Sequence, residues 1–280
     1  MKKLSPAAYR PLVRAALRED VGPGGDVTTR FFVPARARFK ARVVSRESGV
    51  VCGLDVAAAV FRACDRGARV RALVREGARV RPGQAVLEVS GGRGLLTAER
   101  TALNFLQRMS GVATLTRRYV DLVKGTRARI LDTRKTLPGW RALDKYAVVC
   151  GGGLNHRMGL YDAAMVKDNH YLGKRLAEGA RALRGARPGV PLIVECDTPA
   201  QATRALALKP DVLLLDNMPP ALLKSEIARL RRLAPRIELE ISGGVSLKTV
   251  RALARLGPDR ISIGRLTHSV PALDLGLDLA

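Results

Sequence analysis

The second half of the chain repeats a unit made of a short apolar segment, a polar or glycine-rich turn and a helical segment. Six apolar segments have the length of buried strands, and helical segments such as 200–208 and 221–233 lie between them. Near-continuous apolar strands that alternate with helices are typical of a parallel sheet covered on its outer face. The pattern therefore predicts an α/β fold for this half. The predicted strands are 128–131, 163–166, 192–194, 212–215, 237–240 and 260–263.

Each predicted strand is followed by charged, polar or glycine residues. In a closed barrel such strand ends meet at one mouth, where barrel enzymes bind their substrates, whereas an open sheet would spread them along an edge. Six strands are fewer than a complete eightfold barrel needs. We therefore expect an incomplete, TIM-like α/β barrel. The strand ends are Asp132-Thr133-Arg134-Lys135, Lys167-Asp168-Asn169-His170, Glu195-Cys196-Asp197, Asp216-Asn217, Ser242-Gly243-Gly244 and Gly264-Arg265.

The first third of the chain has a different pattern, typical of a small α+β domain. Residues 6–17 predict a helix, and Asp26 is typical of a helix cap. Short strands are predicted at 39–45, 49–52, 70–74 and 85–89. A helical stretch at 97–124, continuous or broken near Ser110, then connects the two parts. We expect an N-terminal α+β open sandwich domain at residues 1–110, the α/β barrel at 111–270, and a C-terminal tail at 271–280 that packs on the first domain.

The formal net charge of +24 at first suggests a nucleic-acid-binding protein. Three observations weaken this interpretation. Arginines occur along the whole chain, aromatic residues make up only 4%, and no helix-turn-helix, RNA-recognition or zinc-finger pattern is present. Solvated helix faces account for most of the excess charge. A basic nucleic-acid-binding protein remains the alternative from a different functional class.

The remaining composition indicates an intracellular protein without a metal cluster of its own. Charged residues interrupt the apolar residues that follow Met1, and no later segment resembles a membrane span. We expect a cytoplasmic protein with no membrane or nucleic-acid partner. The cysteines form no CxxC pair and lie among apolar or small residues, which favours structural thiols over a zinc site or disulfides. They are Cys52, Cys64, Cys150 and Cys196.

Two of the late strand ends predict a phosphate site. Ser242, Gly243 and Gly244 precede a predicted helix at 247–255, and Gly264 ends the last strand. Small residues let backbone N–H groups approach an anion, and a helix N-terminus adds a favourable dipole. Late barrel loops commonly bind phosphate in this way.

Two carboxylates, Glu195 and Asp216, end neighbouring strands and are expected to face each other. Such a pair accepts hydrogen bonds from ribose hydroxyls, or holds Mg²⁺ directly or through water. The alternative is a structural ion pair with Lys167 or Lys135. Both interpretations are compatible, because charges in an empty site pair with each other until substrate arrives.

Positive charge is concentrated between residues 131 and 170. Arginine suits planar carboxylates in a bidentate manner, whereas lysine suits diphosphate as a point charge. A glycine run at 151–153 lets the following loop pass close to a ligand. This density of positive charge predicts that the segment binds a small polyanionic ligand. The cationic candidates are Arg134, Lys135, His156, Arg157 and Lys167.

With these motifs the chain resembles the quinolinate phosphoribosyltransferase family almost from end to end. The matching stretches are LREDVGPGGDVTT, ERTALNFLQRMSGVATLT, DTRKTLPGWRALDKYAVVCGGGLNHRMGLYDAAMVKDNH, VECDT, LLLDNM, EISGGV and ISIGRLTHS. The resemblance implies that quinolinate attacks C1 of phosphoribosyl pyrophosphate. Diphosphate and CO₂ are then released, leaving nicotinate mononucleotide for NAD biosynthesis. The nearest alternative is a paralogue acting on nicotinate, but the retained NHR and VKDN segments favour the dicarboxylate.

The resemblance also implies roles for individual residues. Quinolinate would be bound by Thr133, Arg134, His156 and Arg157, together with Arg100 of the partner subunit, so a homodimer with a shared site is implied. Phosphoribosyl pyrophosphate would be bound by Lys135, Lys167, Glu195, Asp216, Ser242, Gly243, Gly244, Gly264 and His268. Lys135, Lys167, Glu195 and Asp216 are the implied catalytic residues. Glu195 and Asp216 would hold Mg²⁺, and no organic cofactor is implied. Arg265 stands where the family more often has a small residue.

Overall fold

The computed structural model describes residues 3–171 and 175–280, and contacts divide the chain into two units. Unit 1 comprises Met1–Arg117, Thr136–Gly152 and Arg265–Ala280, and unit 2 comprises Arg118–Lys135 and Gly153–Gly264. The predicted divisions after residues 110 and 270 follow the chain linearly. The division by contacts instead interleaves the two units, because tertiary packing draws 136–152 and 265–280 into unit 1.

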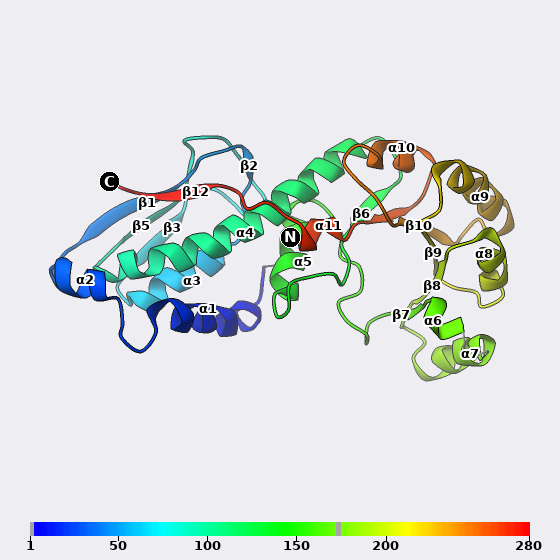
Figure 1. Cartoon of the computed structure of the whole chain (residues 1–280), viewed down its shortest axis with the longest axis horizontal. Coiled ribbons are helices and arrows are strands. Elements are labelled where there is room, and N and C mark those ends of the chain that lie inside the picture. The colour runs from blue at the N-terminus through cyan, green and yellow to red at the C-terminus, as the bar shows by residue number, and fades with distance from the viewer. Residues whose placement is uncertain (1–2, 172–174) are drawn as a thin grey trace. The chain divides into compact units, whose positions relative to one another are not determined.

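Unit 1 contains an antiparallel sheet in the order β12-β1-β5-β3. Its strands are β1 (Phe39–Ser45), β3 (Arg69–Ala72), β5 (Ala85–Gly91) and β12 (Leu275–Leu279). The C-terminal strand β12, in red, runs beside β1, in blue (Figure 1). A separate two-stranded ladder joins β2 (Gly49–Val50) to β4 (Arg79–Val80). The C-terminal residues thus complete the sheet of the first domain.

The two helices with predicted bounds, 6–17 and 97–124, lie at Pro6–Val21 and Gly94–Leu122. The carboxylate of Asp26 accepts a hydrogen bond from the Thr29 amide at 2.9 Å, which confirms the predicted cap. The long helix is continuous through Ser110 and Gly111, where a break was one alternative. A Cβ on Gly111 would lie 2.2 Å from the Pro271 carbonyl oxygen, so this glycine serves close packing. The helices are α1 (Pro6–Val21), α2 (Val27–Phe32), α3 (Leu54–Cys64), α4 (Gly94–Leu122, which ends in unit 2), α5 (Arg141–Cys150) and α11 (Arg265–His268).

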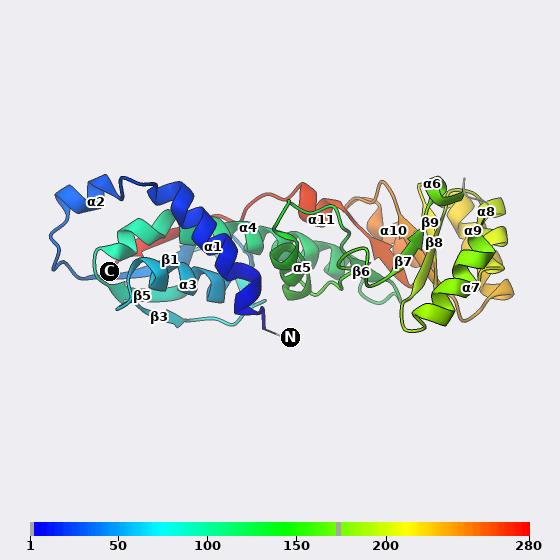
Figure 2. The same ribbon diagram turned by 90° about the horizontal axis from the view of Figure 1, so that it is seen from below.

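Unit 2 is built on a parallel six-stranded sheet in the order β6-β11-β10-β9-β8-β7. Within the described residues, no ladder joins the outer strands β6 and β7, so the sheet is the incomplete α/β barrel that the repeat predicts. Helices α7, α8 and α9 lie on the same side of strands β7 to β9 in both views (Figures 1 and 2). The strands are β6 (Arg129–Leu131), β7 (Ala164–Val166), β8 (Leu192–Cys196), β9 (Val212–Asp216), β10 (Glu238–Ser242) and β11 (Arg260–Ser262). The helices are α6 (Asp168–Tyr171), α7 (Leu176–Ala186), α8 (Pro199–Leu206), α9 (Pro220–Leu233) and α10 (Val250–Arg255).

Apolar burial explains why this sheet forms. Val194, Leu213 and Leu215 are completely buried, as a parallel strand covered on both faces requires. Ala163, Ile193, Val212 and Leu214 form one buried apolar cluster. Among the helices of the described residues, none combines the length and apolar character needed to cross a membrane.

A buried carboxylate, Asp259, joins several elements of unit 2. Arg127 and Arg231 each donate to one of its oxygens, and the Leu239 amide donates to it at 2.8 Å. Burial by itself would raise the pKa of Asp259, but the Leu239 hydrogen bond and the two guanidinium groups outweigh burial and hold that pKa below its ordinary value. The carboxylate therefore stabilises the fold through its charge.

Replacing Asp259 by asparagine is expected to lower the free energy of unfolding by about 2 kcal/mol near neutral pH. Because the folded-state pKa lies below the unfolded value of about 3.9, this stabilisation is present above that value and is lost as the pH falls through the folded pKa. Urea denaturation at several pH values measures both effects. The matched control is Asp278→Asn, which removes the exposed pair with Arg46 and should change stability far less. If the difference in free energy of unfolding between Asp259→Asn and wild type persisted unchanged into strong acid, this account would be contradicted.

Candidate active site

A cavity of about 180 Å³ lies at the carboxyl ends of the strands of unit 2. All six parallel strands contribute to it, through their last residues or the loops that follow them. This is the mouth at which α/β barrels bind substrates. The lining residues are Thr133, Arg134, Lys135, His156, Arg157, Met165, Lys167, Glu195, Leu214, Asp216, Glu240, Ser242 and Ser262.

Most of the predicted site residues of unit 2 line this cavity. Gly243, Gly244 and Gly264 also belong to unit 2 but do not line it. Arg100 and His268 are exposed residues of unit 1, and their roles stay predictions. The predicted residues that line the cavity are Thr133, Arg134, Lys135, His156, Arg157, Lys167, Glu195, Asp216 and Ser242.

An ion pair joins the cationic and acidic sides of the cavity. The Lys167 ammonium, just after β7, contacts the Glu195 carboxylate in β8. Their side chains are 38% and 12% exposed, so the pair stands at the border between interior and solvent. The predicted alternative of a structural ion pair is therefore present in the structure. A polyanionic ligand can compete for the lysine, because the pair remains accessible.

Arg157 forms the half-buried part of the cationic side. Its guanidinium donates to the Ala163 carbonyl oxygen at 3.1 Å, which fixes its orientation. Burial, followed by the nearby charge of Arg134, lowers the pKa of Arg157 from its ordinary value. Two guanidinium groups that repel each other in this way favour an anion between or beside them.

His156 contacts Asp132, Arg157 and Glu240 within unit 2. Its amide donates to the Asp132 carboxylate at 2.9 Å, and its ring Nδ1 accepts from the Arg157 amide at 2.7 Å. Since Nδ1 accepts, the ring proton is on Nε2, which lies 3.3 Å from the Glu240 carboxylate. The two side chains are 5% and 0% exposed. The ring therefore bridges the loop that carries Arg157 and the strand β10.

Glu240 was missed by the sequence analysis. The signal for it is a carboxylate between Leu239 and Ile241, in the middle of an otherwise apolar strand. A charged residue is rarely buried without a partner, so a carboxylate at this position predicts an ion-pair or hydrogen-bond partner in the fold. The partner, His156, lies far away in the sequence and is brought close only by the fold.

The glycine loop after β10 has a backbone that requires glycine. Gly243 has a φ of +88°, and a Cβ there would lie 2.1 Å from the Asn217 side-chain oxygen. The helix predicted at 247–255 was wrong at its start, since α10 begins at Val250. Residues 247–249 form a turn in which the Ser246 carbonyl oxygen accepts from the Thr249 and Val250 amides at 3.1 and 2.9 Å, and the Ser246 amide donates to the Thr249 hydroxyl at 3.0 Å.

Models of known protein families match both parts of the chain. The model of the quinolinate phosphoribosyl transferase N-terminal domain matches residues 26–110, and that of the C-terminal domain matches residues 112–278. The chain belongs to the quinolinate phosphoribosyl transferase family.

Individual relatives agree with this family over nearly the whole chain. The nicotinate-nucleotide pyrophosphorylase [carboxylating] of Mycobacterium leprae is 48% identical over 276 residues, which cover 97% of each chain. The solved nicotinate-nucleotide pyrophosphorylase of Francisella tularensis has a TM-score of 0.92 at 34% identity, covering 99% of this chain and 98% of its own. The Ehrlichia chaffeensis structure of that name has a TM-score of 0.91 at 34% identity and covers both chains fully.

Another phosphoribosyltransferase resembles this chain in fold but not closely in sequence. Human nicotinic acid phosphoribosyltransferase has a TM-score of 0.56 at 15% identity, covering 99% of this chain and 74% of its own. At this identity the likeness concerns the fold alone. It therefore gives no support to the alternative of a nicotinate-specific paralogue within the quinolinate phosphoribosyl transferase family.

Proposed function

We propose that this enzyme transfers the phosphoribosyl group of phosphoribosyl pyrophosphate to quinolinate, with loss of CO₂, and yields nicotinate mononucleotide and diphosphate. One observation carries the proposal. In a chain of the quinolinate phosphoribosyl transferase family, a cavity at the barrel mouth combines cations, among them Arg134, Arg157 and Lys167, with the carboxylates Glu195 and Asp216. This combination suits two anionic substrates that react through a positively charged ribose.

The cationic side of the cavity would bind the substrates by charge and shape. Arg134 and Arg157 match the planar carboxylates of quinolinate, as bidentate partners. Lys135 and Lys167 would neutralise diphosphate oxygens as point charges, and Lys167 would exchange its contact with Glu195 for a substrate anion. Thr133 holds the Lys135 amide through its hydroxyl at 3.0 Å and so orders this strand end.

Transfer requires stabilisation of charge more than movement of protons. The ring nitrogen of quinolinate forms a bond to C1 of the ribose while the bond from C1 to diphosphate breaks. Positive charge develops on the ribose in the transition state, and Glu195 and Asp216 would face it from the mouth. CO₂ then leaves the adjacent ring carbon, and the electron pair of the broken carbon–carbon bond stays on that carbon, where the positively charged pyridinium nitrogen stabilises it. A proton from solvent converts this carbanion into the C–H bond of nicotinate mononucleotide.

Mg²⁺ is the cofactor that these carboxylates fit. Magnesium prefers oxygen ligands and is commonly held by one or two carboxylates plus substrate phosphate oxygens. Glu195 and Asp216 line the cavity and end neighbouring strands, so they are the residues that would hold the ion. Bound magnesium would neutralise charge on the diphosphate.

The reaction can be tested directly. Purified enzyme is supplied with phosphoribosyl pyrophosphate, Mg²⁺ and carboxyl-labelled quinolinate, and CO₂ release and nicotinate mononucleotide are measured together. We expect both products in equal amounts and loss of turnover when Mg²⁺ is chelated. Turnover of nicotinate in place of quinolinate would transfer the assignment to the paralogous activity. Magnesium-independent, salt-sensitive retention of DNA or RNA without turnover would favour the nucleic-acid alternative.

The enzyme would act as a homodimer in which Arg100 of the partner subunit completes each site. Exposed apolar side chains support self-association: Phe31 and Phe32 of α2 are 74% and 83% exposed, and Leu160 and Tyr161 are 74% and 68% exposed. Aromatic residues are enriched in protein interfaces, and such side chains rarely cluster on a free surface.

Two inactive variants are expected to restore activity to each other if the site is shared. Arg100→Ala keeps an intact barrel mouth, whereas Lys167→Ala keeps Arg100, so a mixed dimer holds one complete site. Random mixing should then recover up to about a quarter of wild-type activity, because half of the dimers are mixed. Each variant mixed with itself is the control. Mixed dimers that are confirmed by mass spectrometry yet remain inactive would exclude the shared site.

A further inference from the structure

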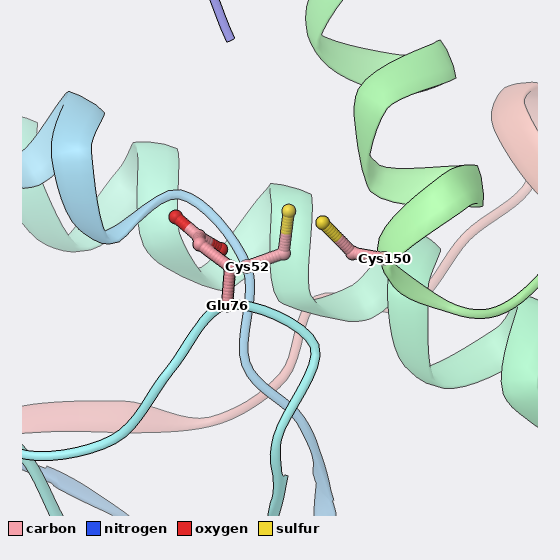
Figure 3. A group of neighbouring side chains, drawn as sticks. All are labelled: Cys52, Glu76 and Cys150. Atoms are coloured by element: carbon pink, nitrogen blue, oxygen red, sulfur yellow. The ribbon is translucent and has the colours of Figure 1, made fainter. Parts of the chain in front are cut away.

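Three side chains of unit 1 converge although they lie on separate segments. Cys52 follows β2, Glu76 lies between β3 and β4, and Cys150 ends α5. Their sulfur and carboxylate atoms all lie within 4.8 Å of one another. The two sulfur atoms face each other, with the Glu76 carboxylate beside Cys52 (Figure 3). In residues 3–171 and 175–280 this is the only group of three histidine, cysteine or acidic side chains that is so compact.

The backbone around the cluster is held firmly. The Cys52 amide donates to the Ser110 hydroxyl at 2.9 Å, and the Glu76 carboxylate accepts from the amides of Gly53 and Leu54 at 2.8–3.1 Å. Gly77 has a φ of +76°, and a Cβ there would lie 3.0 Å from the Cys150 carbonyl oxygen. The three segments are therefore packed against one another, and the three candidate ligands are positioned in advance.

No positively charged side chain is among the largest causes of the pKa shifts in the cluster. Burial raises the pKa of the Cys52 thiol well above its usual range, and Cys150 and Glu76 raise it further. Burial, again as the largest cause, raises the pKa of Glu76 and of Tyr146, one helical turn before Cys150. Acidic groups that penalise each other's ionisation are the groups that a bound cation stabilises.

We propose that Cys52, Glu76 and Cys150 form a structural site for a divalent thiophilic cation, zinc in the first place. Two thiolates and one carboxylate are suitable zinc ligands, and water or the Tyr146 hydroxyl would complete four-coordination. On binding, each thiol releases one proton to solvent and no group is oxidised or reduced. Because both cysteines are buried, the ion would enter during folding.

A disulfide between the two cysteines is the competing outcome. Disulfide formation needs a thiolate and an oxidant that reaches it, and burial disfavours both. With a disulfide, Glu76 would keep its hydrogen bonds to the Gly53 and Leu54 amides, but its charge would have no part in the cluster. A metal site uses all three groups and ties the end of α5 to the loops around β2 and β4. The chain continues from Cys150 through a glycine run to His156, so the site would anchor one end of a segment that lines the catalytic cavity.

The test uses the full chain, unfolded in chelator and refolded with or without Zn²⁺. We expect one zinc per chain by mass spectrometry after desalting, and a higher unfolding temperature for the zinc form. Refolding with Co²⁺ should give the sulfur-to-cobalt charge-transfer absorption, a readout that needs no variant. Correctly folded protein that binds no zinc would refute the site. So would a mass lower by two hydrogen atoms, which reports the disulfide.

Variants locate the ligands. Cys52→Ser with Cys150→Ser should weaken zinc binding by more than about 100-fold, because even changes outside the ligand shell cost about 10- to 100-fold. Cys64→Ser is the matched control: this thiol is only half-buried, lies outside the cluster and should leave zinc binding unchanged. The single amide oxygen of Glu76→Gln can still accept from both Gly53 and Leu54, as Oε1 of the carboxylate does, so a loss of zinc there reports the charge and not a misfolded loop. Zinc retained by the double serine variant would place the ion elsewhere and overturn the proposal.

Discussion

Replacing Glu195 by glutamine is expected to lower kcat for phosphoribosyl transfer by about 10²- to 10³-fold, with little change in KM for quinolinate. Glu195 lines the cavity from β8, where its charge would face the ribose as diphosphate departs. Glutamine keeps the size and the hydrogen-bonding capacity of the side chain but removes the charge. The interaction lost is therefore one that strengthens in the transition state, so kcat changes more than substrate affinity.

The matched control for this prediction is Glu178→Gln on α7. Glu178 is exposed and pairs with Arg175 at 2.8 Å, so the same chemical change is made on the same unit but away from the cavity. Steady-state measurement of CO₂ release should show wild-type kinetics for the control. Should Glu195→Gln keep a wild-type kcat, the Glu195 charge would have no part in stabilising the transition state.

The fold of unit 2 was predictable because its signals are local. Strands such as Val212–Asp216 are continuous apolar runs that end in charge, and the segment predicted at 212–215 differs from this strand by one residue. The parallel order then brings charged strand ends together without further information. For this reason Lys167, Glu195 and Asp216 could be assigned to one cavity from the sequence.

Two features that escaped prediction depend on contacts between distant segments. Glu240 stood out only as a charge within an apolar strand, and its contact with His156 exists only in the folded sheet. Cys52 and Cys150 lie on different segments of unit 1, and no spacing rule links them. The start of α10 was misplaced for a local reason: residues 247–249 form a hydrogen-bonded turn before the regular helix, and residue periodicity does not distinguish such a turn from a helical one.

Replacing Glu240 by leucine is expected to lower kcat/KM for quinolinate by about 10²-fold, the usual effect of moving a binding group by about 1 Å. Glu240 faces the proton-bearing Nε2 of His156 at 3.3 Å, and the other ring nitrogen holds the Arg157 amide. Loss of the carboxylate frees the ring and with it the loop that orients Arg157. Glu240→Gln should keep most of the activity, because its amide oxygen can face the same nitrogen. KM for phosphoribosyl pyrophosphate should change little in either variant.

A double-mutant cycle distinguishes positioning through His156 from a general effect on folding. If Glu240 acts through the histidine ring, Glu240→Leu costs little further activity in a His156→Ala background, and the two losses are strongly non-additive. Fully additive losses would show that the two residues act separately. Stability gives an independent readout. Glu240→Leu removes one partner of a buried pair and leaves the Nε2–H of His156 without its carboxylate, so the unfolding temperature should fall with the activity. Removing both partners of a buried pair is often neutral or stabilising, so the double variant should recover unfolding temperature while its activity stays low. A merely structural role would restore both together.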